Sequence, residues 1–236
     1  MKAYINKIET FGLSDGPGIR TVIFFQGCKL RCKFCHNPES WNTSLKGNYT
    51  VDEVFNKIMR CKPYFGDNGG VTFSGGEPLL HKDFLIELCK KLKKENVHIA
   101  LDTAGIANGN YKELLDLVDL VLLDVKAIDK YSFKDITNTD NFNKYLEFIK
   151  ELNESNKDIW IRQVIIPGIN DNKEYIKNLK KFINKNIKNV KKIEFLPFHT
   201  MAFSKYNDLG INNPYKDIEA MDKEKCLELE KYYNEI

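Results

Sequence analysis

Six short segments of the chain are apolar nearly throughout, and polar residues follow each of them closely. The segments are Ile19–Gln26, Val71–Phe73, Val97–Asp102, Leu117–Val125, Ile159–Ile166 and Lys192–Leu196. Strands that are covered on both faces show such near-continuous apolar runs, whereas half-exposed strands alternate between apolar and polar positions. The pattern therefore predicts six buried strands.

Amphipathic helical patterns separate these segments. Apolar residues recur three and four positions apart over 51–59, 84–92, 142–152 and 176–187, which is the period of a helix with one buried face. Thr50 and Glu53 have the spacing of a capping box at the start of the first stretch. We further expect a short helix at 111–117 and a last helix near 223–233. Strands that alternate with helices predict a parallel sheet with helices outside it.

The polar residues at the strand ends distinguish between two such folds. Six strand–helix units are too few for a closed eight-stranded barrel, so a partial barrel and an open doubly wound sheet both fit. An open sheet would place its ligand at one switch point, whereas polar groups here follow every strand. We therefore expect an α/β fold, a partial (β/α)6 barrel of parallel strands with outer helices. One domain is expected over 1–236, with its core at about 15–200 and a C-terminal helix at 222–235.

Composition and charge exclude several classes of protein. The 236 residues are 42% hydrophobic, which supports a sizeable core, and the net charge is only +3. No apolar run is long enough to span a bilayer, and the N-terminus lacks the apolar region of a signal peptide. No basic stripe indicates a nucleic-acid partner. We therefore expect a cytoplasmic protein, in which thiols stay reduced. Six cysteines in a chain of this length do not form a disulfide scaffold.

Three cysteines in one short loop carry the strongest chemical signal. Cys28, Cys32 and Cys35 are spaced C-x3-C-x2-C, and no fourth cysteine lies nearby. Iron–sulfur clusters are held by cysteine thiolates, and three thiolates leave one iron of a four-iron cluster open for chemistry. The alternative is a structural zinc site completed by His36. It is less favoured, because structural zinc ligands usually form two pairs that are far apart in sequence.

These motifs resemble those of the radical S-adenosylmethionine superfamily. The cysteine triplet with Phe34 before its last member is one match, and Gly75-Gly76-Glu77-Pro78 is similar to the second motif of that family. The segments Asp15–Arg20, Phe25–Cys28 and Cys35–Pro38 resemble, more narrowly, the activating enzymes of glycyl radical enzymes. The resemblance extends from Ile8 to about His199.

The resemblance implies a cofactor pair and a reaction. Cys28, Cys32 and Cys35 would bind a [4Fe-4S] cluster, and S-adenosylmethionine would chelate its open iron. One electron from the reduced cluster would cleave the sulfonium to methionine and a 5′-deoxyadenosyl radical. That radical would remove a hydrogen from a glycine of a partner enzyme. The protein is thereby expected to be an oxygen-sensitive oxidoreductase that works anaerobically.

The resemblance also assigns cofactor contacts around the first two motifs. Gly75 and Gly76 would let the methionine moiety approach the backbone, since glycine has no side chain. Glu77 would shape this loop rather than act as a base. Phe34 would flank the adenine, and His36 would reach the nucleotide.

Further contacts are implied at the ends of later strands. Asp124, Val125 and Lys126 resemble the Asp-x-Lys contact of the family to the cofactor. Asp102, Thr103 and Asp124 would form a site for a monovalent cation, because clustered oxygen atoms suit a hard cation. The residue-based alternative for Asp124 and Lys126 is a surface ion pair.

Three more residues complete the predicted site. Arg162 lies within an apolar strand and needs a partner, since an unpaired buried charge is costly; the cofactor carboxylate or ribose would supply one. His199 would close the pocket against the nucleoside, with a satisfied core histidine as the alternative. Asp15, at the rim of the site before the first strand, would contact the glycine loop of the partner.

The partner itself is inferred from what the chain lacks. Only eight residues separate Trp41 from Thr50, so the cysteine-rich insert of many related activators is missing. This favours pyruvate formate-lyase as the partner. The alternatives are an activator of anaerobic ribonucleotide reductase and, from another class, a non-catalytic iron–sulfur or zinc-binding module. The resemblance further implies flavodoxin or ferredoxin as electron donor and a monomeric protein, while the stretch Phe133–Asn138 departs from the family pattern.

Overall fold

One strongly curved sheet forms the centre of the protein. In this computed structural model, which describes residues 1–107 and 109–236, the sheet has the strand order β2-β3-β5-β6-β7-β8-β9. Its strands are β2 (Ile5–Gly12), β3 (Arg20–Phe25), β5 (Gly70–Gly75), β6 (His98–Thr103), β7 (Leu120–Asp124), β8 (Asp158–Ile165) and β9 (Val190–Pro197). Strands β3 to β9 are all parallel, and β2 is antiparallel to β3. The predicted partial barrel of parallel strands is confirmed.

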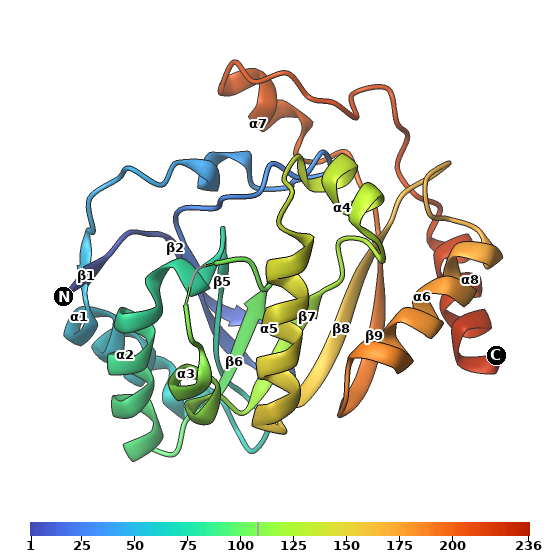
Figure 1. The fold of residues 1–236 in the computed structure, drawn as a ribbon. Coiled ribbons are helices and arrows are strands. Elements are labelled where there is room, and N and C mark those ends of the chain that lie inside the picture. Colours follow the sequence, from blue (N-terminus) through green and yellow to red (C-terminus); the bar gives the residue numbers. More distant parts are fainter. Residues whose placement is uncertain (108) are drawn as a thin grey trace.

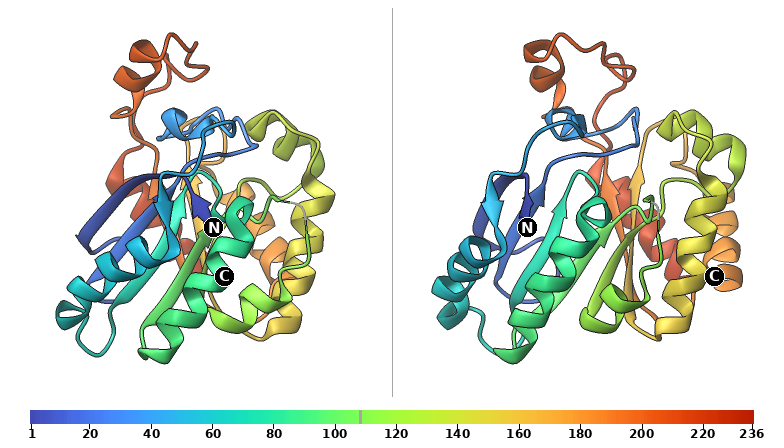
Figure 2. Two further views of the ribbon diagram at one scale, coloured as in Figure 1. Left: turned by 90° about the vertical axis from the view of Figure 1, so that its left-hand side faces the viewer. Right: turned by 60° about the vertical axis from the view of Figure 1, so that its left-hand side comes forward.

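Helices cover the outer face of this sheet (Figures 1 and 2). They are α1 (Val51–Cys61), α2 (Lys82–Lys94), α3 (Lys112–Leu117), α5 (Phe142–Ser155), α6 (Lys173–Asn186) and α8 (Lys223–Glu235). Two other helices, α4 (Lys130–Thr137) and α7 (Phe203–Asp208), lie above the carboxyl ends of the strands. Short 3-10 turns η1 (Pro38–Trp41), η2 (Lys62–Tyr64) and η3 (Pro78–His81) and a small sheet of β1 (Lys2–Ala3) and β4 (Tyr49–Thr50) complete the chain.

Helix α1 shows how local sequence sets an element. The Thr50 side chain accepts a hydrogen bond from the Glu53 backbone nitrogen at 3.3 Å, and Glu53 Oε2 accepts one from the Thr50 backbone nitrogen at 2.7 Å. This is the predicted capping box, and it satisfies two backbone donors that have no partner within the helix. The helix then buries Val51, Val54 and Ile58 against the core.

Each parallel strand presents one face to the helices and one to the barrel interior. Ile99, Leu101, Val121 and Leu123 are fully buried in the main core under the helices. Side chains alternate between the faces of a strand, so their neighbours point inward. The inner face begins with a separate apolar cluster of Ala100, Leu120 and Leu122, against which Trp160 packs. This cluster fills the barrel below the polar strand ends.

Polar residues follow the apolar inner cluster at the next inward position of each strand. Asp102 lies two residues after Ala100, Asp124 two residues after Leu122, and Arg162 two residues after Trp160. The register pairs Asp124 with Arg162 on adjacent strands. The period of two thus brings charges from distant parts of the sequence to one level of the barrel.

Several elements differ from the sequence prediction. Strand β2 was not predicted; it is an edge strand with mixed burial, so it lacks the continuous apolar run of the others. Helices α4 and α7 are short and were also missed. Strand β7, which the sequence predicted over Leu117–Val125, begins at Leu120, because α3 continues to Leu117. No helix in the described part of the chain combines the length and apolar character that crossing a bilayer requires.

Candidate active site

A cavity of about 240 Å³ opens at the carboxyl ends of the parallel strands. Functional sites of barrel enzymes lie at this end, because loops from many strands meet there. The cavity is lined by most of the residues that the sequence predicted for the site, namely Asp15, Cys28, Cys32, Phe34, Cys35, His36, Gly75, Gly76, Asp102, Thr103, Asp124, Lys126 and Arg162. Residues separated by more than a hundred positions therefore share one chamber.

The three cysteines lie on the loop that follows β3. This loop is held to its surroundings by backbone hydrogen bonds: the amide of Gly27 donates to the Ser40 carbonyl at 2.8 Å, and the amide of Arg31 to the Thr137 carbonyl at 2.9 Å. The three thiols are free, with Cys32 buried and Cys28 and Cys35 half-buried. The loop is thus a fixed support for three thiol groups around the cavity.

Burial controls the protonation of these thiols. It raises the pKa of Cys28 to about 12, and it also raises the pKa of Cys32 and of Cys35 above the ordinary value. Metals bind the thiolate. Without a bound cation the three groups therefore stay protonated, and coordination of a metal would remove their protons.

The arrangement suits a cluster better than a single metal ion. Among the described residues, no three His, Cys, Asp or Glu side chains are grouped so that they could hold one ion. A structural zinc ion needs four ligands around one centre. In an iron–sulfur cluster each thiolate binds a different iron, so three separated thiols around a cavity fit that group.

The remaining cysteines lie elsewhere. Cys89 is fully buried in α2 and Cys226 is buried in α8, while Cys61 is half-buried at the end of α1. We predict that the variant Cys61→Ala/Cys89→Ala/Cys226→Ala keeps the full iron and sulfide content of the anaerobically purified protein. Loss of the cluster from a folded triple variant would show that the ligand assignment to the cysteine loop is wrong.

The two glycines of the second motif make close contacts within the protein. A Cβ atom on Gly75, whose φ is +110°, would lie 2.4 Å from the backbone nitrogen of Phe25. A Cβ atom on Gly76 would lie 2.3 Å from the carbonyl oxygen of Gly27, next to Cys28. Both glycines also line the cavity. The sequence predicted that these glycines leave space for the cofactor. The structure shows that they also leave space for the backbone of Phe25, at the end of β3, and of Gly27, which follows it.

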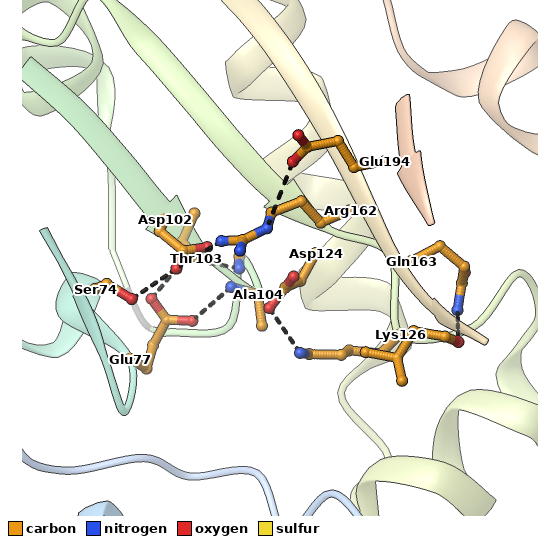
Figure 3. A network of polar contacts seen from close by, with 12 residues as sticks. Ser74, Glu77, Asp102, Thr103, Ala104, Asp124, Lys126, Arg162, Gln163 and Glu194 are labelled. Atoms are coloured by element: carbon orange, nitrogen blue, oxygen red, sulfur yellow. Dashed lines mark hydrogen bonds and ion pairs between the residues drawn. The ribbon is translucent and has the colours of Figure 1, made fainter. Parts of the chain in front are cut away.

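Glu77 is buried beneath the cavity and does not line it. Its carboxylate accepts hydrogen bonds from the Thr103 hydroxyl at 2.5 Å and from the Ala104 amide at 3.0 Å (Figure 3). It also accepts one from the Leu79 amide at 3.1 Å. It thus connects the end of β5 to the end of β6. This geometry is that of a residue that shapes the loop.

Glu77 gives the stability of the protein a specific pH dependence. Burial raises its pKa from the usual 4.5 to about 7, although the hydrogen bonds oppose this. Between these pH values the folded protein holds a proton that the unfolded chain has lost, so stability falls as the pH rises. We predict that the stability advantage of the unmodified protein over Glu77→Gln, measured by urea unfolding of the cluster-free protein, shrinks from pH 5 to pH 8. A difference that does not vary with pH would refute this protonation.

Five charged side chains face one another across the barrel (Figure 3). Arg162 Nη1 lies 3.2 Å from Asp102 Oδ2, and Arg162 Nε lies 4.0 Å from Glu194 Oε2. Lys126 Nζ lies 2.7 Å from Asp124 Oδ2. Asp102 raises the pKa of Arg162, and burial raises the pKa of Asp102 to about 6. The expected partner of Arg162 is therefore supplied by the protein itself.

Aromatic rings form another wall of the cavity. Lys126 Nζ lies 5.3 Å from the centre of the Phe34 ring, within the range of a cation–π contact. The rings of His36 and His199 are stacked, with centroids 3.8 Å apart and planes 11° apart. Burial, and then the neighbouring His199, lower the pKa of His36 to about 4, so that this ring is neutral at pH 7. His199 contributes to the wall through His36 and is not among the lining residues.

Some of the side-chain oxygens predicted to bind a monovalent cation already have hydrogen-bond partners within the protein. Asp102 Oδ1 is buried without a hydrogen-bond partner in the described structure, and Asp102 Oδ2 accepts from Ser74 Oγ at 2.6 Å. The Thr103 hydroxyl donates to Glu77 and accepts from the amide of Gly105 at 2.9 Å. The free Asp102 oxygen therefore fits a cation, while the Thr103 hydroxyl is already engaged.

One predicted residue, Val125, is placed differently from expectation. The side chain of Val125 is buried in the core, and its amide donates to the Arg162 carbonyl at 2.9 Å, so it does not line the cavity. Asp15 belongs to the segment between β2 and β3, and it is among the residues that line the cavity. Thr72 Oγ1 donates to the Asp15 carbonyl at 2.6 Å, and buried Arg20 donates to Thr72 Oγ1 at 2.6 Å, which fixes this turn.

Some functional residues were not predicted. Ser74 holds Asp102, and its place in the strand-end motif was an available signal. Trp41 and Asn37 line the cavity from η1 and from the residue before it. Glu194 faces Arg162 from β9. The positions of Trp41 and Glu194 depend on the fold, and neither carries a local sequence signal.

The sequence of the chain matches a known family model. Residues 22–183 match the model described as "Radical SAM superfamily". The matched segment contains the cysteine loop, the glycine motif and the charged strand ends described above. The fold and the site therefore define a radical S-adenosylmethionine protein, a class that uses a [4Fe-4S] cluster and S-adenosylmethionine.

Proteins that are similar to this chain over nearly its full length indicate which family within the superfamily it belongs to. The chain is 49% identical over 233 residues to the pyruvate formate-lyase-activating enzyme of Clostridium pasteurianum, covering 98% of this chain and 97% of that protein. It is 42% identical over 243 residues to the enzyme of the same name from Staphylococcus aureus (strain USA300), covering 99% and 96%. The chain therefore belongs to the radical SAM superfamily and, within it, to the family of pyruvate formate-lyase-activating enzymes.

A solved structure supports the fold independently of close sequence similarity. The radical SAM methyltransferase from Sphaerobacter thermophilus aligns with a TM-score of 0.64 at 15% identity, covering 92% of this chain and 64% of that one. At this identity the likeness concerns the fold alone. It agrees with the partial barrel described above.

Proposed function

We propose that this chain activates pyruvate formate-lyase by placing a radical on a glycine of that enzyme. The observation that carries the proposal is a cavity that is lined both by the three-cysteine loop and by Asp15. A cofactor held by the cysteines and a peptide loop near Asp15 would meet inside it. The full-length similarity to activating enzymes supports the same partner.

The bound groups supply the radical chemistry. A reduced [4Fe-4S] cluster held by Cys28, Cys32 and Cys35 would supply the electron that cleaves the sulfonium of S-adenosylmethionine, and this cleavage would yield methionine and a carbon radical able to take a hydrogen atom from glycine. The protein binds, orients and shields these groups. The side chains of the protein therefore contribute mainly by holding the cofactors and the partner's glycine in the correct positions.

The proposed roles follow from the contacts. Cys28, Cys32 and Cys35 would hold the cluster. Phe34 and the neutral His36 would face the nucleoside as flat, uncharged surfaces. Asp102 Oδ1 would be available for a cation or a polar group of the cofactor, because it is buried and has no partner in the described residues.

The ion pairs have a further role in this proposal. Lys126 is held by Asp124, and Arg162 by Asp102 and Glu194. Paired charges can remain in a largely buried part of the barrel, whereas single charges there are costly. The network therefore keeps the polar groups in fixed orientations before the cofactor binds.

The function is tested by activation of candidate partners. Reduced protein and S-adenosylmethionine are incubated anaerobically with pyruvate formate-lyase or with anaerobic ribonucleotide reductase, and the activity of each partner is measured. We expect only pyruvate formate-lyase to gain activity. Activation of the reductase alone would assign the chain to another branch, and cofactor cleavage without activation of either would reject the proposal.

Asp15 is the proposed contact for the partner's glycine loop. Asp15 lines the cavity from the segment between β2 and β3, whereas the cysteines follow β3. Holding the partner's loop in line with the reacting atoms contributes strongly to the rate. We predict that Asp15→Ala lowers glycyl radical formation by at least about tenfold, while methionine formation without partner stays near that of the unmodified protein. Asp67→Ala, an exposed carboxylate on the loop after η2, serves as the control. Equal losses in both assays would show that Asp15 supports the cofactor site instead.

The proposal also covers the electron donor, the oligomeric state and the cellular location of the protein. Lys29 and Arg31 are exposed on the cysteine loop, and an acidic flavodoxin or ferredoxin would be attracted to such a surface. We further propose a cytoplasmic monomer of one domain. Reduction of the cluster by each purified donor, compared at low and high salt, tests the donor.

A further inference from the structure

The segment between β9 and α8 forms an arm above the carboxyl ends of the strands. It includes α7, which lies apart from the helices that cover the sheet (Figures 1 and 2). The two ends of the arm meet at Phe198: the amide of Met221 donates to the Phe198 carbonyl at 2.7 Å, and the Tyr215 ring contacts the Phe198 ring at 6.2 Å. The arm is therefore closed at its base.

Helix α7 contacts the backbone next to the third cysteine. The hydroxyl of Tyr206 donates to the carbonyl of Cys35 at 2.9 Å. Tyr206 is almost fully buried, and its ring meets Trp41, which lines the cavity, at 6.1 Å.

Lys205 holds the residues that follow Cys35. Its ammonium group donates to the carbonyl of His36 at 3.0 Å, to Asn37 Oδ1 at 3.0 Å and to Glu39 Oε1 at 2.6 Å. A lysine has three donors, and all three are directed at this one stretch of the loop. His199, at the start of the arm, stacks on His36.

The two halves of the cysteine loop thus have different supports. The amides of Arg31 and Lys33 donate to carbonyls of Thr137 and Ile136 at the end of α4, both at 2.9 Å. The half that begins at Cys35 is held by Tyr206 and Lys205 of α7. Without the second support, the carbonyls of Cys35 and His36 would lose their side-chain donors.

We propose that Lys205 and Tyr206 are positioning residues, which hold the backbone of Cys35 and His36 so that the third thiolate and the His36 ring keep one orientation toward the cluster and S-adenosylmethionine. Neither residue lines the cavity, so each acts through the loop. The inference rests on the proposed assignment of the cluster to the cysteine loop, and it is independent of the identity of the partner.

Cluster retention is the first test. Tyr206→Phe, Lys205→Ala and the double variant are reconstituted with iron and sulfide, and the loss of visible cluster absorbance is followed anaerobically in excess chelator. We expect several-fold faster loss in each single variant and a larger effect in the double variant. Lys216→Ala, an exposed lysine on the same arm, should behave as the unmodified protein, and Lys205→Arg should recover much of the retention.

Spectroscopy separates positioning from a merely structural role. The electron paramagnetic resonance spectrum of the reduced cluster is recorded while S-adenosylmethionine is added, and we expect the concentration that gives half of the spectral change to rise several-fold in Tyr206→Phe and Lys205→Ala. Unchanged chelation rates and an unchanged titration in the double variant would overturn the proposal. So would unfolding of the cluster-free Tyr206→Phe protein, because the arm would then be needed for the fold itself. Cys35→Ser is included as a reference: a cluster retained there would refute the ligand assignment and not the role of the arm.

Discussion

Replacement of Cys35 by serine is expected to leave the protein without a stable [4Fe-4S] cluster and without detectable radical formation. The cavity offers three thiols from one loop, and the other cysteines lie in α1, α2 and α8. No nearby thiol can replace the missing ligand in the described structure. Iron content, visible absorbance and methionine formation from S-adenosylmethionine measure the loss.

Cys61→Ser is the matched control for this variant. Cys61 is a half-buried thiol like Cys35, but it lies at the end of α1 away from the cavity. It should keep the cluster and the cleavage activity. A Cys35→Ser protein that purifies with full iron and cleaves S-adenosylmethionine would show that the third ligand has been assigned to the wrong residue.

Replacement of Gly76 by valine is expected to have an effect of comparable size. Even the first carbon of the new side chain would lie 2.3 Å from the Gly27 carbonyl oxygen and 2.8 Å from its carbonyl carbon. Both atoms are backbone, so the β5 loop or the start of the cysteine loop must move. Displacement by about 1 Å can lower a rate about a hundredfold, and here it also disturbs the loop that carries Cys28.

The measurements are cluster content and the binding of S-adenosylmethionine to the reduced cluster. Both should fall in Gly76→Val. Gly66→Ala is the control, since a Cβ atom there meets no atom within 4 Å, although its φ of +55° adds local strain. Normal cluster content together with normal cofactor binding in Gly76→Val would contradict the contact between the two loops.

The sequence predicted the layered fold because its signals were local and strong. Buried parallel strands carry long apolar runs, and the capping box at Thr50 marks the start of α1. The edge strand β2 gave no such run, because it is only partly buried. Helices α4 and α7 were missed because each is about two turns or less and depends on contacts with the cysteine loop.

The charged residues of the site were predictable for a different reason. Asp102, Asp124 and Arg162 each interrupt an apolar strand at an inward position, and an ionisable group there requires a partner. The sequence could name these residues but not their pairing. Glu194 is the register partner of Arg162 on the neighbouring strand β9, and Asp102 reaches Arg162 from β6, which is separated from β8 by β7.

Other features depend on close approaches that only the folded chain reveals. The sequence indicates that Gly76 needs space, and the structure shows that the neighbour is Gly27, nearly fifty residues earlier. Asp15 precedes the first parallel strand, so the sequence placed it at a rim. A hydrogen bond from Thr72, which in turn accepts one from Arg20, fixes this turn, and no local sequence signal indicates that contact.

The most direct test of the account is the detection of a glycyl radical in pyruvate formate-lyase. Reduced protein is mixed anaerobically with S-adenosylmethionine and the lyase, and the radical is quantified by electron paramagnetic resonance beside the methionine formed. The account predicts a glycyl radical on the lyase, in proportion to methionine and absent when S-adenosylmethionine is omitted. Continued formation of methionine with no radical on the lyase would contradict it.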